Sequence, residues 1–102
     1  MLRHVVLFRW REGTTPAEVD AVIDGLGRLP DHVPELRAYH VGPDLGVSAG
    51  TWDFAVVADL DDADALAAYR AHPAHVAVLE EQIQPILAER AAVQYAVEAD
   101  GG

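Results

Sequence analysis

The segment Tyr69-Arg70-Ala71-His72-Pro73-Ala74-His75-Val76 brings a phenol and two imidazoles within seven residues, in a chain that has three tyrosines and five histidines. Proline is tolerated in the first turn of an α-helix but disrupts its interior, so Pro73 predicts the start of a new helix. This break limits where the rings of His72 and His75 can point. Because histidine titrates near neutral pH, the segment is also the first candidate for proton transfer.

Helical signals continue on both sides of this segment. Asp61 or Asp62 is expected to cap a short helix that runs to about Ala71. In the next helix apolar residues recur every three or four positions, and Pro85 within that pattern predicts a kink or an irregular turn. A last strand is predicted at 92–97. The apolar residues of the second helix are Val76, Leu79, Ile83 and Leu87.

The N-terminal part of the chain predicts a strand followed by a helix. Residues 2–10 alternate as a strand, with Leu2, His4, Val6, Phe8 and Trp10 on one face. Thr15 is the expected N-cap, Pro16 takes the first helical position, and Glu18 completes a capping box. The apolar stripe of this helix consists of Val19, Val22, Ile23, Leu26 and Leu29.

The middle of the chain predicts two further strands. Two proline-containing pairs, at 29–30 and 33–34, bracket a loop. Residues 36–41 form the second expected strand, and the glycine-rich segment 43–50 forms a flexible connection. The third strand is expected at 52–60, where apolar residues again alternate.

The predicted order is strand, helix, strand, strand, two helices and strand (β-α-β-β-α-α-β). We therefore expect an α+β fold, a ferredoxin-like plait in which helices cover one face of a four-stranded antiparallel sheet. The other face would be too apolar to leave in water, so two copies are expected to pair through it as a dimeric α/β barrel. Residues 1–98 are expected to form this single domain, with 99–102 as a frayed C-terminal tail.

Composition limits the classes of partner. The formal charge of −10 argues against nucleic acid and anionic membranes, because both are bound through clusters of basic residues. The apolar run at 5–8 is too short for a signal peptide or a membrane span, so neither is expected. The chain has no cysteine, which excludes disulfides and thiolate chemistry and favours a cytoplasmic location. The GxSxG motif of a nucleophile elbow is absent, and because Walker A and GxGxxG motifs are absent too, a nucleotide site is not expected.

Three roles are open for the histidines. As metal ligands, His72 and His75 could share a helix face, but no third ligand is signalled by spacing, so we expect no metal and no other cofactor. As structural residues, His72 would brace the turn before Pro73 and His75 would pack against the sheet. As acid–base groups, Tyr69 and His75 could face one cleft, joined by a buried His4.

Three segments together resemble the stress-responsive dimeric α/β-barrel (Dabb) family, and the resemblance covers nearly the whole chain. They are the opening strand at 3–10, the second strand with the turn after it at 36–46, and His72-Pro73-Ala74-His75-Val76. The resemblance implies the plait inferred above. It also implies homodimers that pair across their sheet faces.

Within this family the chain is similar to polyketide cyclases of the olivetolic acid cyclase type, which share the Tyr-x-x-His-Pro-Ala-His-Val arrangement. The resemblance implies a cofactor-free aldol ring closure on a linear polyketide thioester. In that reaction His75 would remove an acidic α-proton, Tyr69 would polarise a carbonyl and His4 would support the pocket. A further pocket histidine of the cyclases corresponds to Phe54, which changes the polarity of the pocket. The expected substrate contacts are Phe54, Val6, Phe8, Val76 and Leu79.

Three functions follow from these patterns. The first is a homodimer that binds a small apolar or polyketide-like molecule, with His/Tyr acid–base catalysis of the cyclase kind. The second is a non-catalytic stress-response or ligand-binding dimer, in which the histidines only brace the helix turn. The third is a cofactor-independent monooxygenase, which similar barrels host and for which no residue here argues specifically. The catalytic hypothesis requires His4, Tyr69 and His75 to surround one open cavity.

Overall fold

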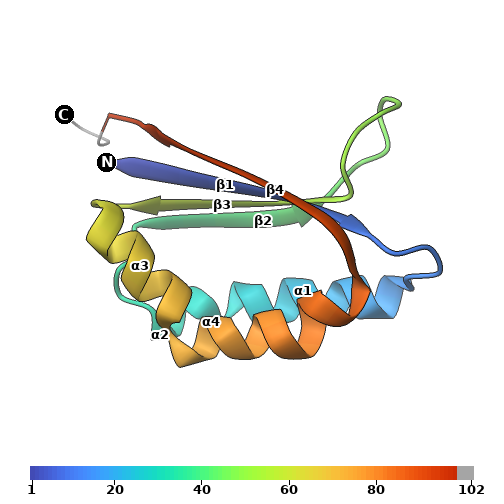
Figure 1. Ribbon diagram of the computed structural model, residues 1–102, viewed down its shortest axis with the longest axis horizontal. Helices are drawn as coiled ribbons and strands as arrows, with labels where there is room; N and C mark the ends of the chain where they lie inside the picture. The colour runs from blue at the N-terminus through green and yellow to red at the C-terminus, as the bar shows by residue number, and fades with distance from the viewer. Residues whose placement is uncertain (99–102) are drawn as a thin grey trace.

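The computed structural model describes residues 1–98 and contains one four-stranded sheet with helices on one of its faces (Figure 1). All strand pairs are antiparallel and the strand order is β2-β3-β1-β4, which confirms the predicted ferredoxin-like α+β fold. The predicted frayed tail, 99–102, lies outside the described residues. The elements are β1 (Leu2–Trp10), α1 (Pro16–Gly27), α2 (Leu29–His32), β2 (Ala38–Pro43), β3 (Phe54–Leu60), α3 (Ala63–Ala71), α4 (Pro73–Val78), the π-helical turn η1 (Leu79–Ile83), the 3₁₀ turn η2 (Gln84–Ile86) and β4 (Leu87–Ala96).

The first strand and helix follow the sequence prediction closely. β1 is a central strand, because it pairs with β3 on one side and with β4 on the other. At the start of α1, the Thr15 hydroxyl accepts a hydrogen bond from the Glu18 N–H (3.2 Å), and the Glu18 carboxylate accepts one from the Thr15 N–H (3.0 Å). This capping box is confirmed, and it satisfies two N–H groups that the first turn leaves without helical partners.

Four elements differ from the prediction. α2 replaces the loop expected between the two proline pairs, because Pro30 lies in its first turn, where a missing N–H costs nothing. β2 is shifted by two residues at each end, and β3 begins two residues later than expected. β4 begins at Leu87, five residues earlier than predicted, because it continues the antiparallel ladder with β1 as far as Trp10. Pairing with a neighbouring strand, and not local composition, determines where β4 begins.

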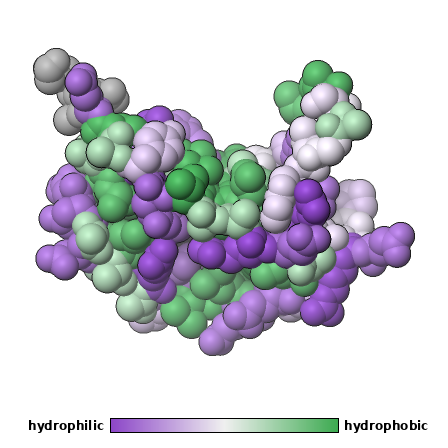
Figure 2. Space-filling view, turned by 45° about the horizontal axis from the view of Figure 1, so that its top comes forward, coloured by the Kyte–Doolittle hydropathy of each residue, from purple (hydrophilic) through white to green (hydrophobic). Residues whose placement is uncertain are grey.

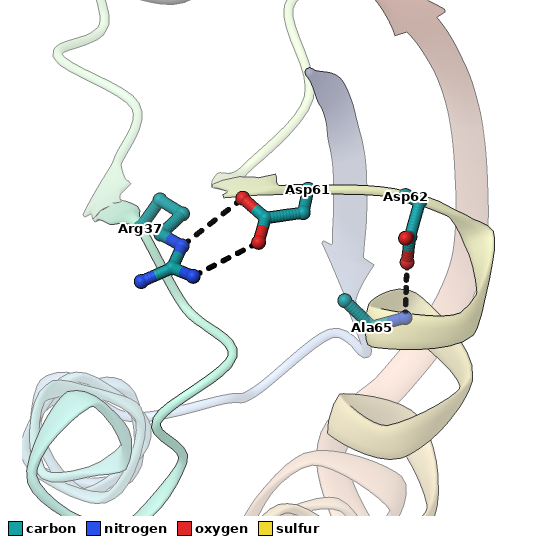
Figure 3. A network of polar contacts seen from close by, with 4 residues as sticks. All are labelled: Arg37, Asp61, Asp62 and Ala65. Carbon is teal, nitrogen blue, oxygen red and sulfur yellow. Dashed lines mark hydrogen bonds and ion pairs between the residues drawn. The ribbon is translucent and has the colours of Figure 1, made fainter.

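The start of α3 is held by two neighbouring aspartates (Figure 3). The Asp62 carboxylate accepts a hydrogen bond from the N–H of Ala65 (2.9 Å), which is the predicted cap. Asp61 instead forms a two-point ion pair with Arg37 (3.0 and 2.9 Å). These contacts tie the end of β3 to α3 and to the segment that leads into β2.

The helix break lies where the sequence predicts it. α3 ends at Ala71 and α4 begins at Pro73. The irregular turn expected near Pro85 is also confirmed, since the helical path passes through η1 and then η2 before β4 begins. Proline cannot donate to a helical ladder, so a regular helix does not continue through this position.

Strand alternation gives the sheet two different faces. The helix-covered face includes His4, Val6 and Phe8 of β1, which are only 3%, 5% and 3% exposed. The strand register places His4 in one cross-strand row with Tyr39 of β2, Ala58 of β3 and Gln94 of β4. The fully buried side chains with the largest volumes are Phe54, Leu26, Leu29, Leu60, Ile83, Val22 and Val33.

The opposite side, which we call the open sheet face, is covered by no helix of the described chain (Figure 1). Apolar side chains are visible on this side in Figure 2, and the loop between β2 and β3 rises from it. At the loop tip, Leu45 and Val47 are 87% and 84% exposed. The open sheet face consists mainly of Val5, Leu7, Val57, Ala91, Val93 and Tyr95.

The helices within residues 1–98 are short. None of the helices there is long and apolar enough to cross a bilayer. α1, the longest of them, has 12 residues, whereas a transmembrane helix needs about 20.

Candidate functional site

A cavity of about 310 Å³ lies between the helix-covered face of the sheet and the helices. Its volume is at the small end of the range for small-molecule sites, about 300–1,000 Å³. Side chains from β1, β3 and β4 form its sheet side, and α1, α3, α4 and η1 supply the remainder. The lining residues are His4, Val6, Phe8, Leu26, Val56, Tyr69, Arg70, His75, Leu79, Ile83 and Arg90.

His4 reaches this cavity from the middle of β1. The side-chain amide nitrogen of Gln94, directly opposite on β4, donates to Nδ1 of His4 (2.7 Å). When Nδ1 accepts a hydrogen bond, the neutral imidazole carries its hydrogen on Nε2. His4 is therefore held as a hydrogen-bond donor.

His75 is held in the opposite tautomer. It lies in α4, and its Nδ1 is 3.1 Å from the carbonyl oxygen of Arg70 at the end of α3. A carbonyl oxygen can only accept, so Nδ1 carries the hydrogen and Nε2 keeps its lone pair. The break at Pro73 makes this contact available, because it turns α4 back toward the last residues of α3. His75 is thus the histidine suited to accept a proton.

His72 has a different role. It is the N-cap of α4, and its Nδ1 accepts a hydrogen bond from the N–H of Ala74 (3.1 Å). This contact satisfies one of the N–H groups at the start of the helix. His72 does not line the cavity. The predicted bracing role of His72 is confirmed.

Tyr69 packs between the two cavity histidines. Its ring centroid is 4.3 Å from that of His75 and 6.5 Å from that of His4. The Tyr69 hydroxyl lies 2.8 Å from the hydroxyl of Tyr39, which belongs to the same cross-strand row as His4. When Tyr39 donates in this pair, the hydroxyl hydrogen of Tyr69 is free for a ligand oxygen. Ala58, a small residue, lies between Tyr39 and His4 in that row.

Burial is the main cause of the pKa shifts in the cavity. The pKa of His4 is lowered to about 4, chiefly because burial disfavours the imidazolium and also because Arg70 and Arg90 are positively charged. Burial also lowers the pKa of His75, and the same guanidiniums add to the effect. Burial raises the pKa of the Tyr69 hydroxyl, against the influence of both arginines. At neutral pH the cavity therefore presents uncharged imidazoles and a protonated phenol.

Six of the eight site residues that the sequence predicts line this cavity, and two do not. His4, Tyr69 and His75 surround it, together with Val6, Phe8 and Leu79. Phe54 is buried beside Phe8 and Trp10, with ring centroids 6.3 and 5.7 Å away. Val76 is half-buried next to His75 but contributes nothing to the lining. On a helix, adjacent residues point about 100° apart, so Val76 cannot share the direction of His75.

Sequence reasoning missed both arginines of the cavity. Arg70 lies inside the segment around Pro73, but only its tyrosine and histidine side chains were interpreted as chemical groups. Arg90 falls before the predicted start of the last strand, so its side could not be assigned. The observed ladder pairs Arg90 with Phe8, which places both on the helix-covered face. Gln94 and Tyr39, the partners of His4 and Tyr69, were also identified only by the structure.

Residues 1–98 contain no group of three or more His, Asp or Glu side chains placed to hold a metal ion. The imidazoles of His4 and His75 are instead held by Gln94 and by the carbonyl of Arg70.

The fold and the cavity together define a class: a four-stranded plait whose helices enclose a small apolar cavity with histidine and tyrosine side chains. Within that class, the chain belongs to the stress responsive A/B barrel domain family (Dabb), which matches residues 2–97. The family resemblance predicted from the sequence is confirmed.

Individual relatives agree with this assignment. The chain is similar to a crystal structure of a dimeric ferredoxin-like protein of unknown function from Thermobifida fusca, with 52% identity, a TM-score of 0.87, and coverage of 94% of this chain and 90% of that one. It is 35% identical over 79 residues to an uncharacterised protein of Streptomyces coelicolor (76% of this chain, 81% of the relative). It is 27% identical over 77 residues to the stress-response A/B barrel domain-containing protein HS1 of Arabidopsis thaliana (74% and 71%).

Proposed function

We propose that this protein binds a small apolar, polyketide-like molecule in the cavity and closes a ring in it by cofactor-free acid–base chemistry. The main support is the convergence of His4, Tyr69 and His75, from three different elements, on one cavity. The six apolar residues among its lining suit a hydrocarbon-rich ligand.

The hydrogen-bond partners of the two histidines support different roles for them. Nε2 of His75 would take a proton from a methylene group between two carbonyls of the ligand, leaving an enolate. The enolate carbon would then attack a second carbonyl of the same molecule, and a carbon–carbon bond forms. The proton would return from Nε2 to the new alkoxide oxygen, so the step needs no co-reactant. The Nε2–H of His4 and the hydroxyl of Tyr69 are the donors available to the carbonyl oxygen on which charge develops.

We propose in addition that the protein is a homodimer that pairs through the open sheet face. Val93 and Tyr95 are 55% and 48% exposed there, beside the half-buried Val5 and Leu7. An apolar surface of this kind is typical of an interface between protein chains. The similar protein from Thermobifida fusca is described as dimeric. Pairing on this face would leave the cavity, on the other side of the sheet, open to a ligand.

The catalytic part is tested by cyclisation of a linear tetraketide thioester. His75→Asn retains an N–H donor where Nδ1 lies but removes the nitrogen at Nε2, so the bond to the Arg70 carbonyl can persist. We expect the rate to fall about a hundredfold, as for loss of a general base. His32→Asn, an exposed position outside the cavity, is the matched control and should retain the wild-type rate.

The outcomes separate two functions. Equal rates for wild type and His75→Asn would remove His75 from the mechanism. If wild type does not cyclise the thioester but binds the ring-closed product in the cavity, the protein is a non-catalytic ligand-binding dimer.

A further inference from the structure

The charges around the cavity oppose the charge of the whole protein. The sequence has 17 acidic residues and 7 basic ones, for a formal charge of −10. Among residues 1–98, however, no Asp or Glu lines the cavity, whereas Arg70 and Arg90 both do. Both arginines are exposed, so they lie at its rim and not in its interior. The cavity entrance is therefore a cationic region of an acidic protein.

Most of the other arginines form an ion pair or a hydrogen bond within the protein. All seven basic residues are arginines. Within residues 1–98, neither Arg70 nor Arg90 has a carboxylate within ion-pair distance or a side-chain hydrogen bond. Among those residues, Arg28 also has no such partner. The engaged arginines are Arg3 with Asp59 (2.8 Å), Arg9 with Glu89 (3.6 Å), Arg37 with Asp61 (2.9 Å) and Arg11 with the carbonyl of Leu87 (3.1 Å).

The two arginines that line the cavity come from distant parts of the chain. Arg70 follows Tyr69 near the end of α3, and Arg90 is on β4 opposite Phe8. Neither belongs to the open sheet face, so dimerisation there would not cover them. Both arginines lower the pKa of His4, His75 and Tyr69, which indicates that their charge is felt throughout the cavity.

We infer that Arg70 and Arg90 bind the anionic headgroup of an amphipathic ligand whose apolar part fills the cavity, an inference that rests on the function proposed above. The headgroup would be a carboxylate or a phosphate, because a guanidinium binds either through two parallel N–H···O bonds. The apolar part would contact Val6, Leu26 and Ile83. The site therefore selects an anionic molecule over a neutral one of the same length.

Octanoate and octanamide test this selection, because they share one apolar chain and differ in headgroup charge. Binding is measured by calorimetry at low salt, and chemical-shift changes at Val6 and Leu79 locate the ligand. We expect wild type to bind octanoate about tenfold more tightly than octanamide, as charge-assisted hydrogen bonds predict. The double variant Arg70→Gln/Arg90→Gln should bind both probes equally. Arg28→Gln, another exposed arginine without an ion-pair partner, should keep the wild-type ratio.

Each outcome bears on a different claim. Equal binding of the two probes by wild type, or an unchanged ratio in the double variant, would overturn the headgroup assignment and leave the cavity function standing. Failure of both probes to bind in the cavity would overturn the proposed function and this inference with it. Octyl phosphate distinguishes the two headgroups: tighter binding than octanoate indicates a phosphate ligand, and weaker binding indicates a carboxylate.

Discussion

The two faces of the sheet are made from alternate residues of the same strands, yet they are completed in different ways. On the helix-covered face, the chain supplies its own cover, and the core there is almost fully closed. The only buried polar residues on that face, within the described chain, are His4 and, from the helices, His75. On the open sheet face, the apolar side chains have no cover from residues 1–98, and Val93 is more than half exposed.

The covered face and the uncovered face therefore differ in what fills them. On the helix-covered face, a cavity interrupts the core, and its two histidines are held by specific hydrogen bonds; under the proposed function this cavity would admit the ligand. On the open sheet face, proposed here as the dimer surface, apolar side chains predominate; the ion pair there between Arg3 and Asp59 (2.8 Å) joins the two central strands. Variants on the two faces should therefore affect different measurements.

The largest expected effect is on the open sheet face. Ala91→Asp places a carboxylate directly opposite Leu7 and close to Val5 and Val93, where the partner's apolar surface would bury it without a counter-charge. An unpaired buried charge costs about 3 kcal/mol or more, which weakens association more than about a hundredfold. Light scattering should show wild type at twice the 11.0 kDa chain mass and the variant at the chain mass.

Ala67→Asp is the matched control, since it adds the same carboxylate at an exposed position of α3. It should remain dimeric. Circular dichroism establishes that Ala91→Asp is still folded. A wild-type mass of 11.0 kDa, or a dimeric Ala91→Asp, would contradict pairing through the open sheet face.

The next effect concerns the buried histidine of the helix-covered face. The pKa of His4 is about 4 in the folded chain against 6.5 for an unperturbed histidine, mainly because of burial. The unfolded chain therefore binds a proton below pH 6.5 that the folded chain does not. The contribution of neutral His4 to the free energy of unfolding is present in full above pH 6.5. It is lost as the pH falls toward 4, and the loss amounts to about 3 kcal/mol.

Urea unfolding at a series of pH values measures this loss. His4→Gln should flatten the curve between pH 6.5 and pH 4, while His75, whose pKa is also lowered, keeps part of the slope. His32→Gln, at an exposed position, should leave the curve as in wild type. An unchanged slope in His4→Gln would show that His4 is not buried in the neutral form.

The smallest expected effect concerns how closely α1 packs against the helical segment that contains Val78 and Gln82. A Cβ at Gly25 of α1 would meet the Gln82 side-chain oxygen and both Cγ atoms of Val78 (3.2 Å each), whereas one at Gly27 would meet nothing within 4 Å. Gly25→Ala should lower the free energy of unfolding by about 1–2 kcal/mol through overpacking. Gly27→Ala should raise it by about 0.5 kcal/mol, because alanine favours the helix. Equal effects of the two substitutions in urea unfolding would contradict close packing at Gly25.

Much of the fold was predictable because its signals are local. The capping box at Thr15 and the break at Pro73 depend on residues a few positions apart, and both lie where predicted. The early start of β4 was not predictable, because Leu87 enters the strand through pairing with Trp10, which is far away in the sequence. The same limit applies to the site. His4, Tyr69 and His75 were identified from residue type and order, but the side of the sheet that Arg90 faces depends on where β4 begins.

The sequence alone determined the order of the strands and of the helices other than α2, the helix break between His72 and His75, and the family that the chain resembles. These depend on short-range rules of capping, proline geometry and alternation. Only the tertiary structure decided how the two imidazoles are held, because their tautomers depend on Gln94 and on the carbonyl of Arg70. It alone brought Arg70 and Arg90 to one cavity rim. Cross-strand register and helix packing join residues distant in sequence, and no local pattern records which atoms they bring together.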